Sequence, residues 1–423
     1  MKVFILSLSL IPVDFMEVFV KTIAIIGAGP AGMSAAIAAA RKGAKVTVFE
    51  RNEIAGKKLL LTGNGKCNFT NVDMHADFFS FEEGSHAELV METMSTKAVC
   101  DFFADMGVLS TERKGCFYPF TGQSQTIQSA LVKTMERLGV KLMTNTCIGE
   151  ITRNNDQFVV HTDNKMMNFD AVILACGGKA APKTGSDGFG YRLARGFGHT
   201  VSRTYPVLVQ LQSDASNLKM VAGVRCYANV SAWVNGVKVA SDYGELQMTD
   251  YGLSGIPVFH LSRFLSKEIE EGMHCEISVD FIPQISKAAL NEFVSERIKT
   301  FYGEPVKTFP EGLVHSKLVE YMIKEQKIEA SAMVLPENKD MLINLLEEMK
   351  DWRFLITGHK GFENAQVTKG GVLLEEIDEN MQSKLIKGLY FAGEMVDVDA
   401  DCGGYNLHWA WASGKKAGEE ATK

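Results

Sequence analysis

Three glycines at a fixed spacing give the first indication of chemistry. Gly27, Gly29 and Gly32 form a G-x-G-x-x-G motif between the apolar run 23–26 and the alanine-rich stretch 33–42. In such a context the first glycine permits a tight turn, the second lets a pyrophosphate approach the backbone, and the third lets a helix pack closely on a strand. The helix start adds free N–H groups and the positive end of its dipole. The motif therefore predicts a bound dinucleotide.

Glu50 supports the same interpretation. It ends the second predicted strand, 45–49, and lies 18 residues beyond Gly32. A carboxylate at this place accepts hydrogen bonds from the hydroxyls of the adenosine ribose. An isolated glycine motif could be an ordinary turn, but strand, small-residue helix and terminal acid together favour dinucleotide binding.

Two further segments favour FAD over NAD. Residues 171–178 (AVILACGG) form an apolar strand that ends in a glycine pair, and residues 388–394 (GLYFAGE) form a second strand followed by a glycine. Both resemble segments of FAD-dependent oxidoreductases, although each alone could be a buried strand. The glycines of 185–190 follow a polar loop rather than a strand, so a separate nicotinamide domain is not predicted.

Composition excludes several classes of protein. The chain has 423 residues, with 44 Lys and Arg against 51 Asp and Glu, and the basic residues are scattered. A nucleic-acid binder would need a basic surface or stripe, so none is expected as a partner. The eight cysteines form no C-x-x-C pair and no zinc spacing with His, which predicts reduced thiols, no metal site and a cytoplasmic location. No stretch reaches the roughly 20 apolar residues that span a bilayer.

The N-terminal residues 3–13 (VFILSLSLIPV) resemble a short signal-peptide core behind Lys2. Asp14 and Glu17 follow, and there is no small-x-small cleavage site. Met16 would serve equally as a start. We therefore expect a start that is non-native or extended upstream rather than an export signal.

The elements that position these motifs change in character along the chain. Apolar periodicity predicts helices over 85–106 and 123–138 and strands over 140–176. The fold class expected is α/β, with a Rossmann-type domain built from residues 20–204 and 352–423. An insert, 205–351, interrupts this domain. Alternating patterns and turns such as Asn235-Gly236 make its first part, 205–283, β-rich, and its second part, 284–351, carries three helical stretches.

A family resemblance covers nearly the whole chain from about residue 20. Residues 56–71 (GKKLLLTGNGKCNFTN) resemble the G-x-K-x-x-x-[ST]-G-x-G-[RK]-C-N-x-T-N signature of the BaiN-like flavoproteins, which include the aminoacetone oxidase group. Residues 184–188, 244–255 and the tail from 393–397 through 403–409 are similar to the same family. The resemblance implies an FAD domain split around a two-part insert.

The chain departs from this family at two places. Many members read L-F-T-H-x-G where residues 248–252 read MTDYG, so no His is assigned there. Residues 399–402 read DADC where a D-G-x-T run is usual. Because that loop is expected near the flavin, substrate preference can differ from that of characterised relatives.

The block 63–68 suits the pyrimidine edge of an isoalloxazine, because Lys66, Asn68 and backbone N–H groups offer hydrogen bonds and positive charge that stabilise the anionic reduced flavin. We expect Cys67 to pack rather than act in redox chemistry, since no resolving Cys is near. His408 could be a general acid but is expected to be packed or solvated. Asp397 either bonds the ribityl chain or caps a helix, and Lys57 and Asp187 are equally open.

The residues expected to contact FAD, including those implied by the resemblance, follow from these motifs. They are Gly27, Ala28, Gly29, Pro30, Ala31, Gly32, Glu50, Arg51, Lys57, Lys58, Gly63, Gly65, Lys66, Cys67, Asn68, Ile148, Ala175, Gly177, Gly178, Asp187, Gly393, Glu394, Gly403, Gly404, Tyr405, Asn406 and Leu407. No catalytic residue is assigned.

The function predicted is that of an FAD-dependent oxidoreductase that transfers hydride through flavin N5. The resemblance implies two reactions: reduction of an activated C=C bond, with NAD(P)H as a transient reductant, or amine oxidation that returns H2O2. We favour the reductase acting on a small molecule. A flavin-bearing redox sensor or RNA-modifying accessory is a third class, and the acidic charge counts against RNA. The substrate and the oligomeric state stay open.

Overall fold

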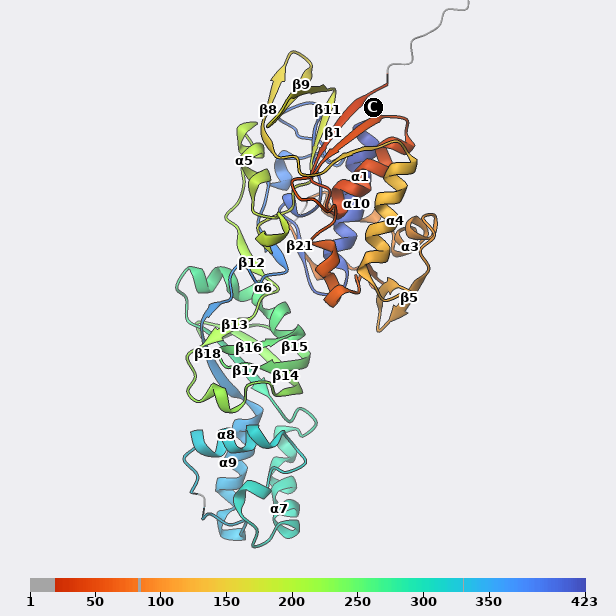
Figure 1. Ribbon diagram of the computed structural model, residues 1–423. Coiled ribbons are helices and arrows are strands. Elements are labelled where there is room, and N and C mark those ends of the chain that lie inside the picture. Colours follow the sequence, from red (N-terminus) through yellow and green to blue (C-terminus); the bar gives the residue numbers. More distant parts are fainter. Residues whose placement is uncertain (1–19, 83–84, 330) are drawn as a thin grey trace, which may run out of the picture.

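The computed structural model describes residues 20–82, 85–329 and 331–423, so the apolar segment 3–13 lies outside the described residues. Three bodies are stacked along one axis (Figure 1): a large α/β domain that holds the C-terminus, a β-barrel, and a small helical bundle at the far end. The chain enters the barrel after the short strand β12 (Tyr205–Val207) and returns through β19 (Val367–Lys369), which pairs with β12 antiparallel.

The α/β domain is built on a five-stranded parallel sheet in the order β20-β11-β1-β2-β7. Most residues of its inner strands are buried and apolar, as parallel strands covered on both faces require. Strand β20 comes from the far side of the insert, so both ends of the chain form one sheet. The strands are β1 (Thr22–Ile26), β2 (Lys45–Phe49), β7 (Lys141–Met143), β11 (Ala171–Leu174) and β20 (Leu389–Phe391).

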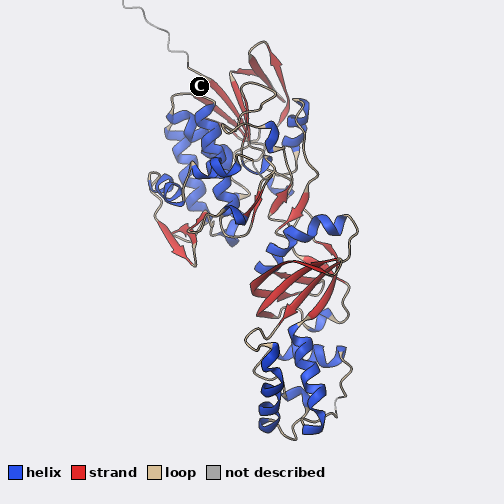
Figure 2. Ribbon diagram, turned by 180° about the vertical axis from the view of Figure 1, so that it is seen from behind, coloured by secondary structure: helices blue, strands red, loops and turns tan. Residues whose placement is uncertain are grey.

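Three helices lie side by side on one face of this sheet (Figure 2): α1 (Pro30–Arg41), α4 (Ser124–Arg137) and α10 (Tyr405–Glu420). Helices α1 and α10 touch along their backbones. A Cβ at Gly414 would overlap the carbonyl oxygen of Ala31, and one at Gly418 would overlap that of Ala35. The glycines of the C-terminal helix therefore set how closely it approaches the glycine-motif helix.

The rest of the α/β domain consists of small sheets and short helices. An antiparallel sheet, β10-β9-β8, packs beside the main sheet, where the ring of Phe169 meets Phe49 edge-on. The elements are β3 (Thr70–Asn71), β4 (Phe79–Ser80), α2 (Ala87–Glu92), α3 (Thr96–Ala104), β5 (Ser110–Arg113), β6 (Cys116–Pro119), β8 (Ile148–Asn154), β9 (Gln157–Thr162), β10 (Met166–Phe169), α5 (Phe189–Gly196) and β21 (Asp399–Ala400).

The insert begins with a closed barrel in the order β13-β16-β15-β14-β17-β18. The turn between β14 and β15 has positive φ at Asn235 and Gly236, as the tight hairpin turn of that sequence requires. Its elements are β13 (Leu211–Ser213), β14 (Arg225–Val234), β15 (Val237–Met248), β16 (Gly252–Gly255), α6 (Ile256–Glu270), β17 (Cys275–Asp280) and β18 (Trp352–His359).

The position of strand β18 places one domain boundary later than the sequence predicts. This strand pairs with β13 and β17, so residues 352–359 belong to the barrel and not to the α/β segment 352–423 expected from the sequence. The sequence shows that strands begin again after the helical stretch, but it does not show to which domain the first of them belongs. This explains the difference.

The helical bundle consists of α7 (Leu290–Thr300), α8 (Ser316–Glu325) and α9 (Lys339–Lys350). Its buried residues, such as Val294, Leu318 and Leu345, join those of the barrel in one apolar core, separate from the core of the α/β domain. Among the described residues, no helix is both long enough and apolar enough to cross a lipid bilayer.

Candidate active site

A cleft of about 1250 Å³ opens at the carboxyl ends of β1, β2, β11 and β20. Parallel α/β sheets bind ligands at this edge, and the volume exceeds the ~300–1,000 Å³ usual for a drug-sized ligand. Its far wall comes from the insert, where Ile256 and Phe259 of α6 line it. One cleft therefore joins the glycine loop to the barrel domain.

The glycine loop has the form that a pyrophosphate needs. Gly27 has φ +104°, and a Cβ there would be 2.5 Å from the carbonyl oxygen of Ala175. A Cβ at Gly32 would overlap the carbonyl oxygen of Gly27, whereas a Cβ at Gly29 would meet nothing within 4 Å. Gly29 is also the N-cap of α1 and provides no side-chain cap. The helix start is thus uncapped beside the open space of the cleft, which fits the phosphates of FAD.

The carboxylate of Glu50 stabilises the glycine loop by hydrogen bonds. Its Oε2 accepts a hydrogen bond from the N–H of Ala28 at 2.9 Å, and its Oε1 accepts from the N–H and the side-chain amide of Asn52 at 2.8 and 2.7 Å. A carboxylate has about four acceptor positions, so one is left for a ribose hydroxyl. The neighbouring Arg51 forms an exposed ion pair with Asp187 at 2.6 Å.

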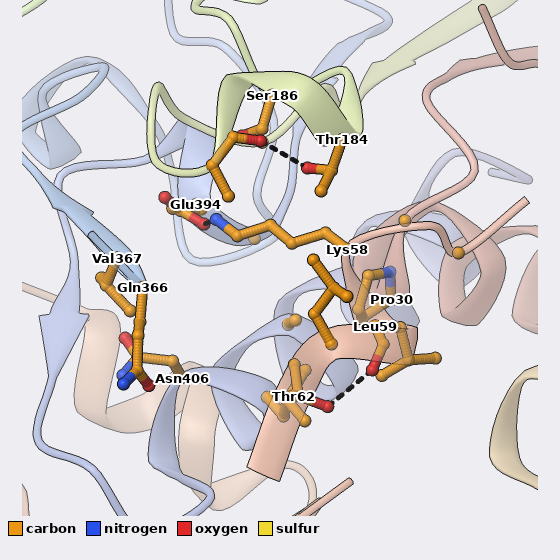
Figure 3. A pocket seen from close by; sticks show the side chains of 18 of the residues that line it. Pro30, Lys58, Leu59, Thr62, Thr184, Ser186, Gln366, Val367, Glu394 and Asn406 are labelled. Atoms are coloured by element: carbon orange, nitrogen blue, oxygen red, sulfur yellow. Dashed lines mark hydrogen bonds and ion pairs between the residues drawn. The ribbon is translucent and has the colours of Figure 1, made fainter. Parts of the chain in front are cut away.

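Lys58 and Glu394 face each other across the cleft (Figure 3), with the Lys58 Nζ atom 2.7 Å from the Glu394 Oε2 atom. The other carboxylate oxygen, Oε1, accepts a hydrogen bond from the N–H of Thr368 at 2.9 Å. This network holds the loop after β2 against the segment after β20.

The block 63–68 lies on the same cleft. Gly63 and Asn64 adopt left-handed conformations inside the 3-10 segment η1 (Leu59–Gly65). The side-chain Oδ1 of Asn68 is buried and has no hydrogen-bond partner among the residues that the structure describes. Because Asn68 lines the cleft, this atom fits a donor on a ligand, such as the imide N–H of a flavin. Cys67 is fully buried, and burial raises the pKa of its thiol to about 12.

Gly403 and Gly404 bring the start of α10 against this block. Both have positive φ, and a Cβ at Gly404 would lie 2.8 Å from the Asn68 Oδ1 atom. Asn406 lines the cleft, yet its amide donates to the carbonyl of Ala400 at 2.7 Å, so it mainly closes its own loop. Tyr405 instead stacks on Phe78 with ring centroids 4.7 Å apart.

The structure brings most of the expected cofactor residues to this cleft. Six do not line it: Gly32, Gly65, Cys67, Gly178, Asp187 and Tyr405. Gly32 faces the glycine loop, and a Cβ at Gly178 would overlap the Thr368 hydroxyl, so both allow close packing. Asp187 pairs with Arg51.

Two other residues weighed from the sequence lie outside the cleft lining. His408 is buried, its Nδ1 is 2.8 Å from the Thr70 hydroxyl oxygen, and burial lowers its pKa to about 4. Asp397 accepts a hydrogen bond from the Ser202 hydroxyl at 2.7 Å, and burial raises its pKa.

Many lining residues carry no sequence signal. They come from the insert, from the return to β19, from the β5–β6 hairpin and from loops after strands. These include Leu208, Ile256, Phe259, Glu363, Asn364, Gln366, Val367, Arg113, Lys114, Cys116, Tyr118, Asn52 and Cys147. A local motif marks none of them, because they reach the cleft only through tertiary packing.

Helix α6 is fastened to the loop that precedes α10. The Arg263 guanidinium pairs with Asp399 at 2.7 Å and with Asp401. Burial would lower the pKa of Arg263, but these two carboxylates outweigh burial and raise it. The loop 399–402 therefore lies between the insert and the cleft, with its two carboxylates paired to one guanidinium.

Comparison with known proteins was made over the whole chain. Residues 21–420 match the HI0933-like protein Rossmann domain. The 3-dehydro-bile acid delta(4,6)-reductase of Clostridium scindens is 37% identical over 404 residues, which cover 95% of this chain and 99% of that one. The ribosomal RNA dihydrouridine synthase of Haemophilus influenzae is 28% identical, covering 92% and 95%.

Solved structures are more distant. The 3-ketosteroid delta1-dehydrogenase of Sterolibacterium denitrificans is 12% identical, with a TM-score of 0.49, covering 95% of this chain and 99% of that one. The family match and the 37% identity confirm the resemblance, the FAD cofactor and the Rossmann-type α/β fold expected from the sequence. The chain belongs to the HI0933-like Rossmann family and is an FAD-dependent oxidoreductase.

Proposed function

We propose that the protein catalyses the NAD(P)H-linked reduction of a C=C bond conjugated to a carbonyl group in a large, mostly apolar small molecule. One observation carries this proposal: the cleft of the glycine loop extends to apolar side chains of the insert and of β19. Leu208, Ile256, Phe259 and Val367 line that end. Such a surface suits a rigid hydrocarbon skeleton better than a small polar amine.

The relatives support reduction over oxidation. The reductase at 37% identity and the dihydrouridine synthase at 28% identity both have names that denote saturation of a carbon–carbon double bond. Because the first covers almost the full length of both chains, we place the substrate in the class of polycyclic enones and dienones, with 3-dehydro-bile acids as the first compounds to examine.

The residues of the cleft divide the work of holding FAD. Gly29 and the start of α1 would receive the pyrophosphate, Glu50 would accept from the adenosine ribose, and Lys66 with Asn68 would meet the pyrimidine edge of the ring. FAD, when bound, supplies a hydride donor and acceptor at N5. The chain itself binds the substrate against the ring and excludes water with the apolar wall of α6.

RNA as a substrate is the second candidate, because two ribosomal RNA dihydrouridine synthases match at 28% and 26% identity. Arg113, Lys114 and Lys66 lie on the cleft and could meet phosphates. The net charge of −7 opposes an extended RNA contact. We therefore propose the small molecule.

The test is an anaerobic titration of the FAD-loaded protein. We expect NADH or NADPH to bleach the flavin absorbance, and a 4-en-3-one or 4,6-dien-3-one steroid to restore it while the steroid gains two hydrogen atoms. Bleaching by an amine but by neither nicotinamide would make the protein an oxidase. If neither a nicotinamide nor an amine bleaches the flavin, the protein would be a sensor. If ribosomal RNA reoxidises the reduced flavin but no steroid does, RNA modification would be favoured.

A further inference from the structure

Three side chains that could move a proton lie close to the insert wall of the cleft, and one of them, Cys402, lines it. His260 follows Phe259 on α6, Asp242 lies on β15, and Cys402 ends the loop 399–402. Phe259 and Cys402 line the cleft and pack on the same small apolar cluster. The group therefore joins the barrel to the α/β domain beside the apolar end of the cleft.

One nitrogen of the His260 ring has a hydrogen-bond partner that fixes the orientation of the ring, and the other nitrogen has none of standard geometry among the described residues. Its Nδ1 lies 2.6 Å from the Asp242 Oδ2 atom. Its Nε2 is buried and has no hydrogen-bond partner of standard geometry within the described part of the chain. Burial would lower the pKa of the ring, but the bond to Asp242 and the adjacent Cys402 outweigh burial and raise it to about 10. With Asp242 as its hydrogen-bond partner the ring favours its protonated form, and the Cys402 side chain is adjacent to it.

The other carboxylates near the ring have a cationic partner of their own. Asp401 also favours the cationic ring, but Arg263, one turn further along α6, pairs with both Asp401 and Asp399. Asp242 is therefore the direct partner of His260, and Cys402 is the group on which the imidazolium can act. Cys176, which also lines the cleft, is buried instead, and burial raises the pKa of its thiol to about 12.

We propose that Cys402 is the proton donor of the reaction and that His260, held by Asp242, is its positioning and recharging residue. This inference rests on the proposed function. With a hydride supplied to one carbon of the substrate double bond by FAD, when bound, the S–H bond of Cys402 would break and its proton would form the C–H bond at the carbon next to the carbonyl. The electron pair stays on sulfur as a thiolate beside the imidazolium. The ring then returns a proton to sulfur and takes one from water.

The first test measures the thiol and needs no turnover. The FAD-loaded protein is treated with iodoacetamide at pH 7 and digested with trypsin. Peptide 388–415 contains Cys402 as its one cysteine, and peptide 142–153 contains Cys147, which also lines the cleft, as the reference. We expect His260→Gln to slow alkylation of Cys402 about tenfold and to leave Cys147 unchanged. Equal rates at Cys402 in both proteins, or no alkylation of Cys402 in the wild type, would overturn the proposal.

The second test separates the two halves of the reaction. In Cys402→Ala, reduction of the flavin by NAD(P)H should keep its rate, while reoxidation by the steroid enone should slow at least about a hundredfold, as loss of a general acid does. Cys402→Ser should recover part of that rate. Cys100→Ala, at a half-buried cysteine of α3 that does not line the cleft, is the control.

The outcomes distinguish this inference from the function on which it rests. If Cys402→Ala is reoxidised at the wild-type rate, the proton donor is another group and the reductase function stands. If the enone does not reoxidise the wild-type protein, both the function and the proton-donor role fail.

Discussion

Lys58 and Glu394 are 336 positions apart in the sequence, yet a 2.7 Å ion pair joins them across the cleft. Lys58 belongs to the loop after β2, and Glu394 follows β20. About a quarter of the Lys58 side chain is exposed. The pair therefore links the N-terminal and C-terminal segments of the α/β domain at the place proposed for the cofactor.

Lys58→Met should weaken FAD binding about tenfold, because the cofactor must then order a loop that the ion pair holds in advance. The free energy of unfolding should fall by less than about 1 kcal/mol, since the pair is partly exposed and water screens it. Quenching of flavin fluorescence measures the affinity. Lys133→Met, at an exposed lysine of α4 away from the cleft, is the control. Unchanged affinity would show that the pair does not order the loop.

Two glycines of the same motif should respond differently to alanine. In Gly29→Ala the new methyl group enters the open space of the cleft, at a φ of −77° that any residue adopts. Its free energy of unfolding should change by no more than about 0.5 kcal/mol, while FAD affinity should fall more than tenfold. Gly32→Ala should cost about 1–3 kcal/mol, because its Cβ overlaps the carbonyl oxygen of Gly27. Urea unfolding of the apoprotein and a flavin titration give the two values. A stable Gly29→Ala that binds FAD normally would place the pyrophosphate elsewhere.

Arg263→Met should destabilise the protein by about 3–5 kcal/mol, because it strands the buried carboxylate of Asp399 next to the half-buried carboxylate of Asp401. Replacing both aspartates by asparagine in the same chain should restore part of the loss. Arg203→Met, which breaks an exposed pair with Glu270, should cost less than about 1 kcal/mol and is the matched control. Chemical denaturation gives all three values, and equal losses at the two arginines would contradict the buried network.

Because His408 is buried, we expect the free energy of unfolding to fall at acidic pH. The pKa of His408 is about 4 in the folded protein and 6.5 when exposed, so between these values the unfolded chain binds a proton that the folded chain does not. Stability from this residue is complete above pH 6.5 and falls as the pH drops toward 4. At pH 4.5 the loss should be about 2–3 kcal/mol. Denaturation of wild type and His408→Gln at pH 7 and pH 4.5 isolates this contribution. The same pH dependence in both proteins would show that the ring is not held neutral.

The parts of the fold that could be predicted have local signals. The apolar run before Gly27 and the similar run before Gly177 indicate buried parallel strands without knowledge of the rest of the chain. The barrel could not be predicted in the same way. Alternation shows that strands exist, but closure depends on β13 pairing with β18, and these strands are separated by the whole helical bundle.

The residues of the site likewise fall into those that the sequence could predict and those that it could not. The glycine loops and the block 63–68 are visible because backbone conformation demands particular residues there. Phe259 and His260 look like any other positions on an amphipathic helix, and only the docking of α6 on the loop 399–402 gives them a place. The unusual Cys402 was visible as a departure from the family pattern, but its partner was not.

The contact between α1 and α10 has a consequence for synthesis. Helix α1 is synthesised long before α10, and the glycines of α10 lie directly on the carbonyl groups of α1. A ribosome must therefore complete the barrel and the bundle before the helix that follows the glycine loop gains its neighbour. A product released before α10 would lack both this helix contact and the residues of α10 that line the proposed flavin site.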